Sequence, residues 1–137
     1  MTYAGDVTPD EAWQALATDP EAVLVDVRTH AEWSYVGVPD LREAGKVLVT
    51  IEWQSYPSGA ANEAFVDQLR EAGVAQDAPV YFLCRSGVRS IAAAKAATAA
   101  GYAGAHNVLE GFEGDLDDAG HRARSGWKVA GLPWRQG

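Results

Sequence analysis

The sequence is poor in features that stabilise exported proteins or hold them in membranes. It has one cysteine among 137 residues, so an internal disulfide is impossible. No apolar run approaches the ~20 residues needed to cross a bilayer. The N-terminus also lacks the basic stretch and apolar core of an export signal. We therefore expect a cytoplasmic protein, with no membrane partner, in which Cys84 remains a thiol.

The composition is typical of one ordinary globular domain. Apolar residues make up 47% of the chain and charged residues 22%, which excludes a disordered or fibrous protein. We expect a single domain over residues 1–137, with a core from about residue 8 to residue 133. A net charge of -8 argues against nucleic acid as a partner, because phosphate binding needs a basic surface.

Acidic residues are missing between Ala78 and Leu109, the stretch that holds the cysteine. The cations and the histidine of this stretch are Arg85, Arg89, Lys95 and His106. The acidic chain therefore contains a local positive region, which favours a small anion as the ligand.

The order of the predicted elements indicates an α/β fold. Thr8 with Glu11, and Thr29 with Glu32, have the spacing of capping boxes at helix starts. The expected elements are a helix over 8–19, a strand over 22–27, a short helix around Trp33, a strand over 46–53, a helix over 62–71, a strand over 79–83, a helix over 90–100, a strand over 105–109 and one helical turn near Trp127. Alternating strands and helices predict a mostly parallel sheet.

Cys84 lies where such a fold binds ligands, between the carboxyl end of a strand and the next helix. The connection reads Cys84-Arg85-Ser86-Gly87-Val88-Arg89 and leads into Ser90. Amide groups at a helix N-terminus, together with two arginines, stabilise a thiolate or another anion. Cys84 is therefore a candidate nucleophile. The other interpretation, a cysteine buried as a small apolar residue, is disfavoured by the flanking arginines and Gly87.

No histidine is placed beside Cys84 by sequence spacing. His30, His106 and His121 are isolated from one another, and we expect each to be a surface or packing residue. This favours a thiolate that attacks unaided and disfavours a papain-like hydrolase.

Several motifs, in this order, resemble a single-domain rhodanese. They are Asp26-Val27-Arg28 with Glu32-Trp33, the cysteine loop from Cys84 to Ser90, Leu109-Glu110-Gly111, and the stretch from Trp127 to Pro133. The resemblance implies a five-stranded, mostly parallel sheet flanked by helices on both faces. It also implies a sulfurtransferase that carries sulfur as a persulfide on Cys84, with no cofactor and no metal.

The resemblance also implies roles for individual residues. The loop residues Arg85, Ser86, Gly87, Val88, Arg89 and Ser90 would bind the substrate and stabilise the persulfide. Asp26, Arg28 and Glu110 would support the loop. Apart from the resemblance, we expect Trp33 and Phe112 to line the rim of the site, next to the insertion after the last strand. The donor would be a small anion such as thiosulfate. The acceptor would be an external thiol or another thiophilic group, including one carried by a protein, because the chain has no second cysteine.

Two alternative functions remain open. The related cysteine-dependent phosphatases and arsenate reductases have the loop arginine six positions after the cysteine. Here that position is Ser90, and Arg89 is at position five, so the shorter loop suits one sulfur atom better than a tetrahedral oxyanion. The second alternative is a binding or redox-sensing module with little turnover.

The sequence departs from the family pattern in two places. Gly37-Val38-Pro39-Asp40 lacks the usual histidine, and Phe112 replaces a glycine. The residues from about 113 to 126 form an insertion whose acidic start is similar to a calcium loop. Ala119 and Gly126 occupy two of its ligand positions, so we expect no metal there.

Overall fold

Five parallel strands form the centre of the molecule. The computed structural model describes residues 3–54, 61–85, 88–109, 111–113, 127 and 130–135, except for the side chains of Tyr35 and Val88. The sheet has the order β1-β6-β5-β2-β4, with every pairing parallel. Its strands are β1 (Gly5–Val7), β2 (Val23–Asp26), β4 (Val49–Thr50), β5 (Pro79–Leu83) and β6 (Gly104–Val108). The predicted five-stranded sheet is confirmed, and β5 lies at its middle.

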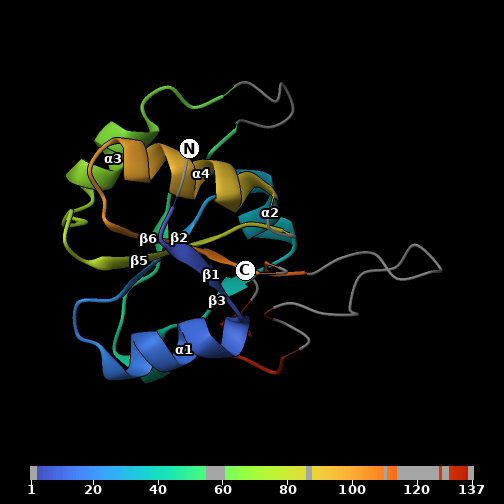
Figure 1. Cartoon of the computed structure of the whole chain (residues 1–137). Coiled ribbons are helices and arrows are strands. Elements are labelled where there is room, and N and C mark those ends of the chain that lie inside the picture. Colours follow the sequence, from blue (N-terminus) through green and yellow to red (C-terminus); the bar gives the residue numbers. More distant parts are fainter. Residues whose placement is uncertain are drawn as a thin grey trace.

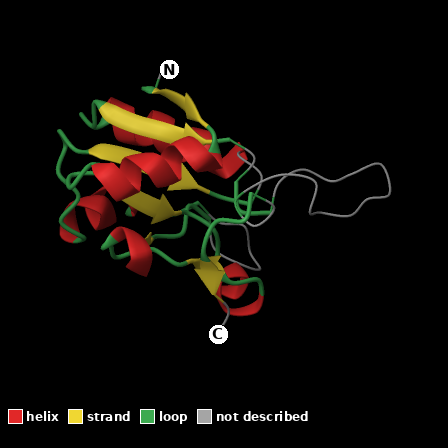
Figure 2. Cartoon of the chain, turned by 90° about the horizontal axis from the view of Figure 1, so that it is seen from below, coloured by secondary structure: helices red, strands yellow, loops and turns green. Residues whose placement is uncertain are grey.

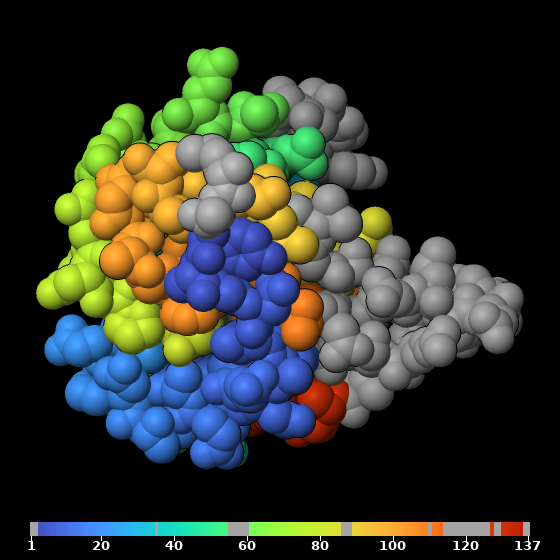
Figure 3. All heavy atoms as spheres, in the orientation of Figure 1, coloured from blue at the N-terminus to red at the C-terminus, as the bar shows by residue number. Residues whose placement is uncertain are grey.

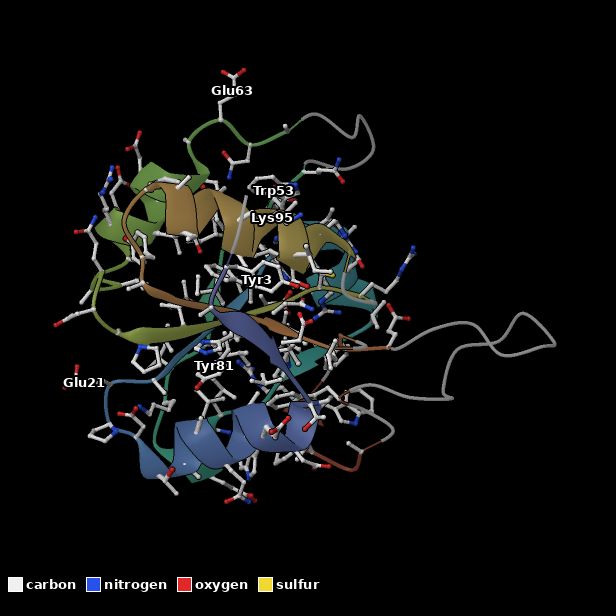
Figure 4. All side chains as sticks on the ribbon, viewed as in Figure 1. Tyr3, Glu21, Trp53, Glu63, Tyr81 and Lys95 are labelled. Atoms are coloured by element: carbon white, nitrogen blue, oxygen red, sulfur yellow. The ribbon has the colours of Figure 1, made fainter. Side chains whose placement is uncertain are left out.

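Helices cover both faces of this sheet, as predicted. They are α1 (Pro9–Thr18), α2 (His30–Tyr35), α3 (Phe65–Glu71) and α4 (Val88–Ala99). Figure 1 shows α1 on one face and α3 with α4 on the other. Tyr81 points to the α1 side and Trp53 lies on the α3 and α4 side (Figure 4). No described helix is long and apolar enough to cross a membrane.

A second, two-stranded sheet lies beside the first. Its strands, β3 (Val38–Pro39) and β7 (Trp134–Arg135), pair antiparallel near the C-terminus (Figure 2). A short 3-10 helix, η1 (Arg42–Ala44), follows β3. Neither β1 nor this second sheet is predicted from the sequence, because strands of two or three residues contain no apolar run that would reveal them.

The alanines of α4 let the helix pack closely on the sheet. Ala93, Ala94 and Ala97 are fully buried against β5 and β6. The strands themselves are buried on both faces, since Val80 and Phe82 face α3 and α4 while Leu83 faces α1. A continuous apolar run is the pattern of such a strand, which explains why β5 is predicted with its observed bounds.

Helix starts are predicted with mixed success. Both capping boxes are present, at Thr8 with Glu11 and at Thr29 with Glu32. The predicted start of α3 at Asn62 is wrong. The Asn62 side chain accepts from the Ala64 N–H and forms a turn, and the helix begins only at Phe65.

Three further expectations differ from the structure or fall outside the described residues. The helix expected from residue 90 begins at Val88. The strand expected over 46–53 is reduced to β4, an edge strand whose neighbour β2 ends at Asp26. Most of the insertion, and the residues on either side of Trp127 where a helical turn is expected, lie outside the described residues.

Candidate active site

Cys84 follows the central strand directly. The hydrogen bonds of β5 to β2 and β6 fix the strand on both sides, and α4 begins four residues after the cysteine. Its side chain is 1% exposed. The carboxyl end of a central parallel strand, next to a helix N-terminus, is the usual place for a ligand in an open α/β sheet. The position predicted for Cys84 is therefore the one observed.

The start of the cysteine loop is held by a segment from the other end of the site. The N–H of Phe112 donates to the Cys84 carbonyl at 2.8 Å, and the N–H of Glu113 donates to the Arg85 carbonyl at 3.0 Å. Gly111 allows this approach: a Cβ atom there would lie 2.4 Å from the Cys84 oxygen. Residues 111–113 thus fix the backbone that carries the thiol.

A chain of polar side chains leads away from the thiol. Cys84 Sγ lies 3.2 Å from Ser90 Oγ. Ser90 donates to Asn107 Oδ1 at 2.5 Å, and Asn107 Nδ2 donates to Asp6 at 3.1 Å. Cys84, Ser90 and Asn107 are each at most 1% exposed, whereas Asp6 lies at the surface on β1. Ser90 is among the site residues that the sequence predicts, whereas Asn107 and Asp6 are not.

Arg89 is bound to a carboxylate of α2. Its two terminal nitrogens donate to the two oxygens of Glu32 at 2.6 and 3.0 Å. The same Glu32 accepts from the Thr29 N–H, so one side chain both caps α2 and holds the loop arginine. Burial opposes ionisation of Glu32, but hydrogen bonds from Arg89 and Thr29 lower its pKa to about 2. The expected positive region is therefore partly neutralised at Arg89.

Asp26 and Arg28 form a fully buried ion pair. Arg28 Nη2 lies 2.7 Å from Asp26 Oδ2, and both side chains are 0% exposed. The same nitrogen donates to the Gly37 carbonyl at 2.7 Å. The guanidinium lies 4.2 Å from the centre of the Phe112 ring, a distance at which a cation is attracted to the ring face. This pair supports the segment next to the cysteine loop.

The two residues expected at the rim lie elsewhere. Phe112 is fully buried in the core beneath α1, because residues 111–113 fold back onto the cysteine loop. Trp33 lines a pocket of about 710 Å³ with residues of β4 and α3. Among the described residues that line this pocket, none belongs to the Cys84 loop.

The remaining predicted site residues are only partly described. Arg85 is exposed at the start of the loop. Ser86, Gly87, Glu110 and the side chain of Val88 lie outside the described residues.

The two described histidines pack against aromatic rings. His106 stacks on Tyr81 with ring centres 4.8 Å apart, and His30 lies edge-on to Trp33 at 6.0 Å. These contacts agree with the prediction that they are packing residues. His121 lies outside the described part of the chain.

Comparison with known proteins identifies the family. The family described as the STR4 middle domain matches residues 4–137. A rice protein named THYLAKOID RHODANESE-LIKE, chloroplastic (Oryza sativa subsp. indica), is 30% identical over 131 residues, which is 95% of this chain and 25% of that protein. The chain belongs to the STR4 middle domain family and has the rhodanese-like fold.

Other similar proteins match nearly the whole length of this rhodanese-like chain. The crystal structure of Rv0390 from M. tuberculosis is 53% identical, with a TM-score of 0.90, over 99% of this chain and 100% of that chain. An uncharacterized protein of Rickettsia conorii is 37% identical over 95% of this chain and 96% of the relative. The polysulfide-sulfur transferase of Wolinella succinogenes, at 21% identity and a TM-score of 0.63 over 96% of this chain and 78% of that chain, shares the fold.

The site residues that sequence reasoning missed are distant along the chain. Asn107 and Asp6 are 101 residues apart, and Glu32 and Arg89 are 57 apart. The one available signal is Glu32, which the sequence identifies as a helix cap. Its second partner depends on the packing of α2 against the cysteine loop, and no local spacing reports such a contact.

Glu32→Gln tests the link between α2 and Arg89. Glutamine still fits the capping box, so the variant should keep α2 but lose the ion pair. Because the pKa of Glu32 is lowered to about 2, the ion pair stabilises the fold above the unfolded-state value of about 4.3. This contribution disappears as the pH falls towards 2. Urea unfolding from pH 7 to pH 2 should give wild type a larger free energy of unfolding than the variant at pH 7, and this difference should close below about pH 4.3. A difference in the free energy of unfolding that does not change with pH would contradict this.

Proposed function

We propose that this protein is a sulfurtransferase that carries sulfane sulfur on Cys84. The observation that supports it most is the position of the thiol: it follows the central strand, precedes a helix of 12 residues, and sits on backbone held by residues 111–113. A helix N-terminus stabilises negative charge on a thiolate or persulfide beside it. The name of the Wolinella protein, a polysulfide-sulfur transferase of the same fold, points the same way.

The proposed reaction has two steps and needs no cofactor. The Cys84 thiolate attacks the outer sulfur of a small anionic donor such as thiosulfate. The donor's S–S bond breaks, sulfite leaves with the electron pair, and Cys84 becomes a persulfide anion. A thiolate acceptor then attacks the outer sulfur, and the electron pair of the broken bond returns to Cys84. The acceptor is external, because the chain contains no second cysteine.

The two loop arginines have different roles in this proposal. Arg85 is exposed and free to approach an anionic donor as it arrives. Arg89 is bound to Glu32, and this hydrogen bond is the main reason that the pKa of Arg89 is raised. A negative charge on Cys84 would raise the pKa of Arg89 further. Arg89 therefore acts mainly by holding the first turn of α4 against α2, while its charge still reaches the sulfur.

Loading with thiosulfate tests the proposal. Incubated protein should gain about 32 Da, the mass of one sulfur atom, on Cys84. The added sulfur should disappear on treatment with cyanide or a reducing thiol, and Cys84→Ala should gain nothing. Intact-mass spectrometry measures each state. If wild type gains no sulfur from thiosulfate or from inorganic polysulfide, the proposal is wrong.

A second candidate is a rhodanese-fold binding or redox-sensing module with little turnover. It is favoured by the Glu32–Arg89 pair, which occupies both terminal nitrogens of the arginine that would otherwise bind a leaving anion. If the fold serves as a binding module, Cys84→Ala would keep the biological activity of the protein, whereas a redox sensor would lose its response together with its one cysteine. A phosphatase assay run beside the sulfur-loading assay tests the alternative of a cysteine-dependent phosphatase. In those enzymes the loop arginine is six positions after the cysteine, whereas Arg89 is five positions after Cys84.

A further inference from the structure

Three cations line a second pocket, away from the cysteine. The pocket has a volume of about 370 Å³ and is lined by residues of the edge strand β4, the 3-10 helix η1 and the small β3–β7 sheet. Its cations are Arg42, Lys46 and Arg135. Among the described residues that line it, none belongs to the Cys84 loop. This pocket is therefore separate from the candidate active site.

The protein neutralises only part of the positive charge in this pocket. Arg42 is bound to Asp40, with Nη2 2.6 Å from Oδ2. Lys46 instead donates to two backbone carbonyls, those of Asp19 at 2.8 Å and Ala22 at 3.0 Å. An ammonium group has three hydrogens, so one is left for a ligand. Asp40 is the one acidic residue among the described residues that line the pocket, so an excess of positive charge remains there.

Arg135 adds its charge to the pocket from the C-terminal side. The described residues 130–135, red in Figure 3, lie at the surface next to α1, and Arg135 is exposed. Hydrogen bonds from Arg42, with a smaller effect from the charge of Arg135, lower the pKa of Asp40 to about 2. Asp40 therefore stays ionised and bound to Arg42 at neutral pH, and Arg135 can reach an incoming anion.

Apolar side chains form the rest of the wall of this pocket. Val47 is 87% exposed, more than any other large apolar side chain in the described part of the chain. The apolar lining residues are Val38, Pro39, Leu41, Val47 and Leu48. Pockets that bind small molecules have volumes of roughly 300–1,000 Å³ and mostly apolar walls with a few polar groups. The pocket beside Val47 has this character.

We propose that this pocket binds a small organic anion. Its charged group, a carboxylate or a phosphate, pairs with Arg42, Lys46 and Arg135, and its apolar body covers Val47 and Leu48. Guanidinium groups form strong hydrogen bonds with such anions, and a bound anion relieves the repulsion between the three cations. The proposal adds a second site to the protein and does not depend on sulfur transfer at Cys84.

The larger pocket beside Trp33 lacks this chemistry. Among its described lining residues, the one that carries a charge is Glu52. The Glu52 carboxylate accepts from the His30 N–H at 2.8 Å, at the start of α2. An anion would meet a like charge there, so the two pockets should respond differently to the same ligand.

Titration of the ¹⁵N-labelled full chain with octanoate tests the proposal. Octanoate has a carboxylate and an apolar body, whereas acetate has the carboxylate alone and octylammonium carries the opposite charge. Octanoate should shift the amide signals of residues 46–50 and of Arg135 most. Acetate should bind at least about 10-fold more weakly, because it buries almost no apolar surface. Octylammonium should leave these signals in place.

Variants at exposed positions show whether the cations hold the anion. Arg135→Gln should weaken octanoate binding about 5-fold, the effect of one ion pair that is open to solvent. The matched control is Arg70→Gln, since Arg70 is exposed on α3, pairs with Asp67 and does not line the pocket. The control should bind octanoate like wild type.

A pair of substitutions at Val47 separates charge from loss of the apolar side chain. Val47→Asp and Val47→Lys both remove the valine, but only the aspartate repels an anion, so Val47→Asp should bind octanoate more weakly than Val47→Lys. Equal affinities in this pair, or in Arg135→Gln and Arg70→Gln, would overturn the proposal. Octanoate shifts centred on the Trp33 pocket or on the Cys84 loop would overturn it as well.

Discussion

Replacing Gly111 by alanine should disable Cys84 and destabilise the fold. Gly111 has a φ of +61°, and an added Cβ would lie 2.4 Å from the Cys84 oxygen and 2.6 Å from the Arg85 carbonyl group. Both obstacles are backbone atoms, so no side chain can move aside. The chain must shift, and the hydrogen bonds from Phe112 and Glu113 to the loop carbonyls must lengthen.

Two quantities should change together in Gly111→Ala. The left-handed backbone alone costs an alanine about 1–2 kcal/mol, and we expect a total loss of about 2–4 kcal/mol in the free energy of unfolding. Sulfur loading of Cys84 should slow by about 100-fold, because misplacement of a reacting atom by about 1 Å has effects of that size. Urea unfolding measures the stability, and the rate of sulfur loading measures the reactivity.

Gly73→Ala is the matched control for this prediction. Gly73 also has a left-handed backbone, with φ of +82°, but nothing lies within 4 Å of its added Cβ. It follows α3, before β5, whereas Cys84 follows β5. The control should lose about 1–2 kcal/mol of stability and keep the reactivity of Cys84. If Gly111→Ala behaved like Gly73→Ala in both measurements, residues 111–113 would not position the thiol.

The sequence predicts the thiol's place well because that prediction depends on local patterns. A continuous apolar run identifies β5, and the glycine and arginines after Cys84 indicate a loop into a helix. The polar groups that extend from the thiol are different in kind. Asn107 meets Ser90 because β6 lies next to β5 beneath α4, and Asp6 meets Asn107 because β1 joins the edge of the sheet. Strand order decides these contacts, and neither strand's own sequence reports it.

The prediction for Phe112 is wrong for the same reason: its position depends on contacts between distant segments of the chain. An aromatic residue in a loop after the last strand, next to an insertion, is consistent with a pocket rim, which is what the sequence leads us to expect. In the structure its N–H donates to the Cys84 carbonyl, and its ring is fully buried with the Arg28 guanidinium 4.2 Å from the ring centre. Both contacts join segments that are distant along the chain, so the local sequence does not report them.

Breaking the buried ion pair should have the largest effect on stability. The Asp-x-Arg pattern occurs at Asp26 and Arg28, and again at Asp40 and Arg42, with similar hydrogen bonds in both pairs. Only the first pair is fully buried, whereas the Arg42 side chain is 80% exposed. In Arg28→Met, the buried Asp26 carboxylate loses the guanidinium and keeps only the hydrogen bond from the backbone N–H of residue 28. The free energy of unfolding should fall by about 3–5 kcal/mol.

The Arg42→Met variant and a double variant determine whether burial is the cause. Arg42→Met should change stability little, because solvent replaces the arginine at the surface. Asp26→Asn/Arg28→Met removes both buried charges and should recover most of the loss, since the penalty comes from the unpaired carboxylate and not from the missing attraction. Urea unfolding of all three variants at pH 7 measures this. Equal losses in Arg28→Met and Arg42→Met, or a double variant less stable than Arg28→Met, would show that the buried pair is not what holds this part of the site.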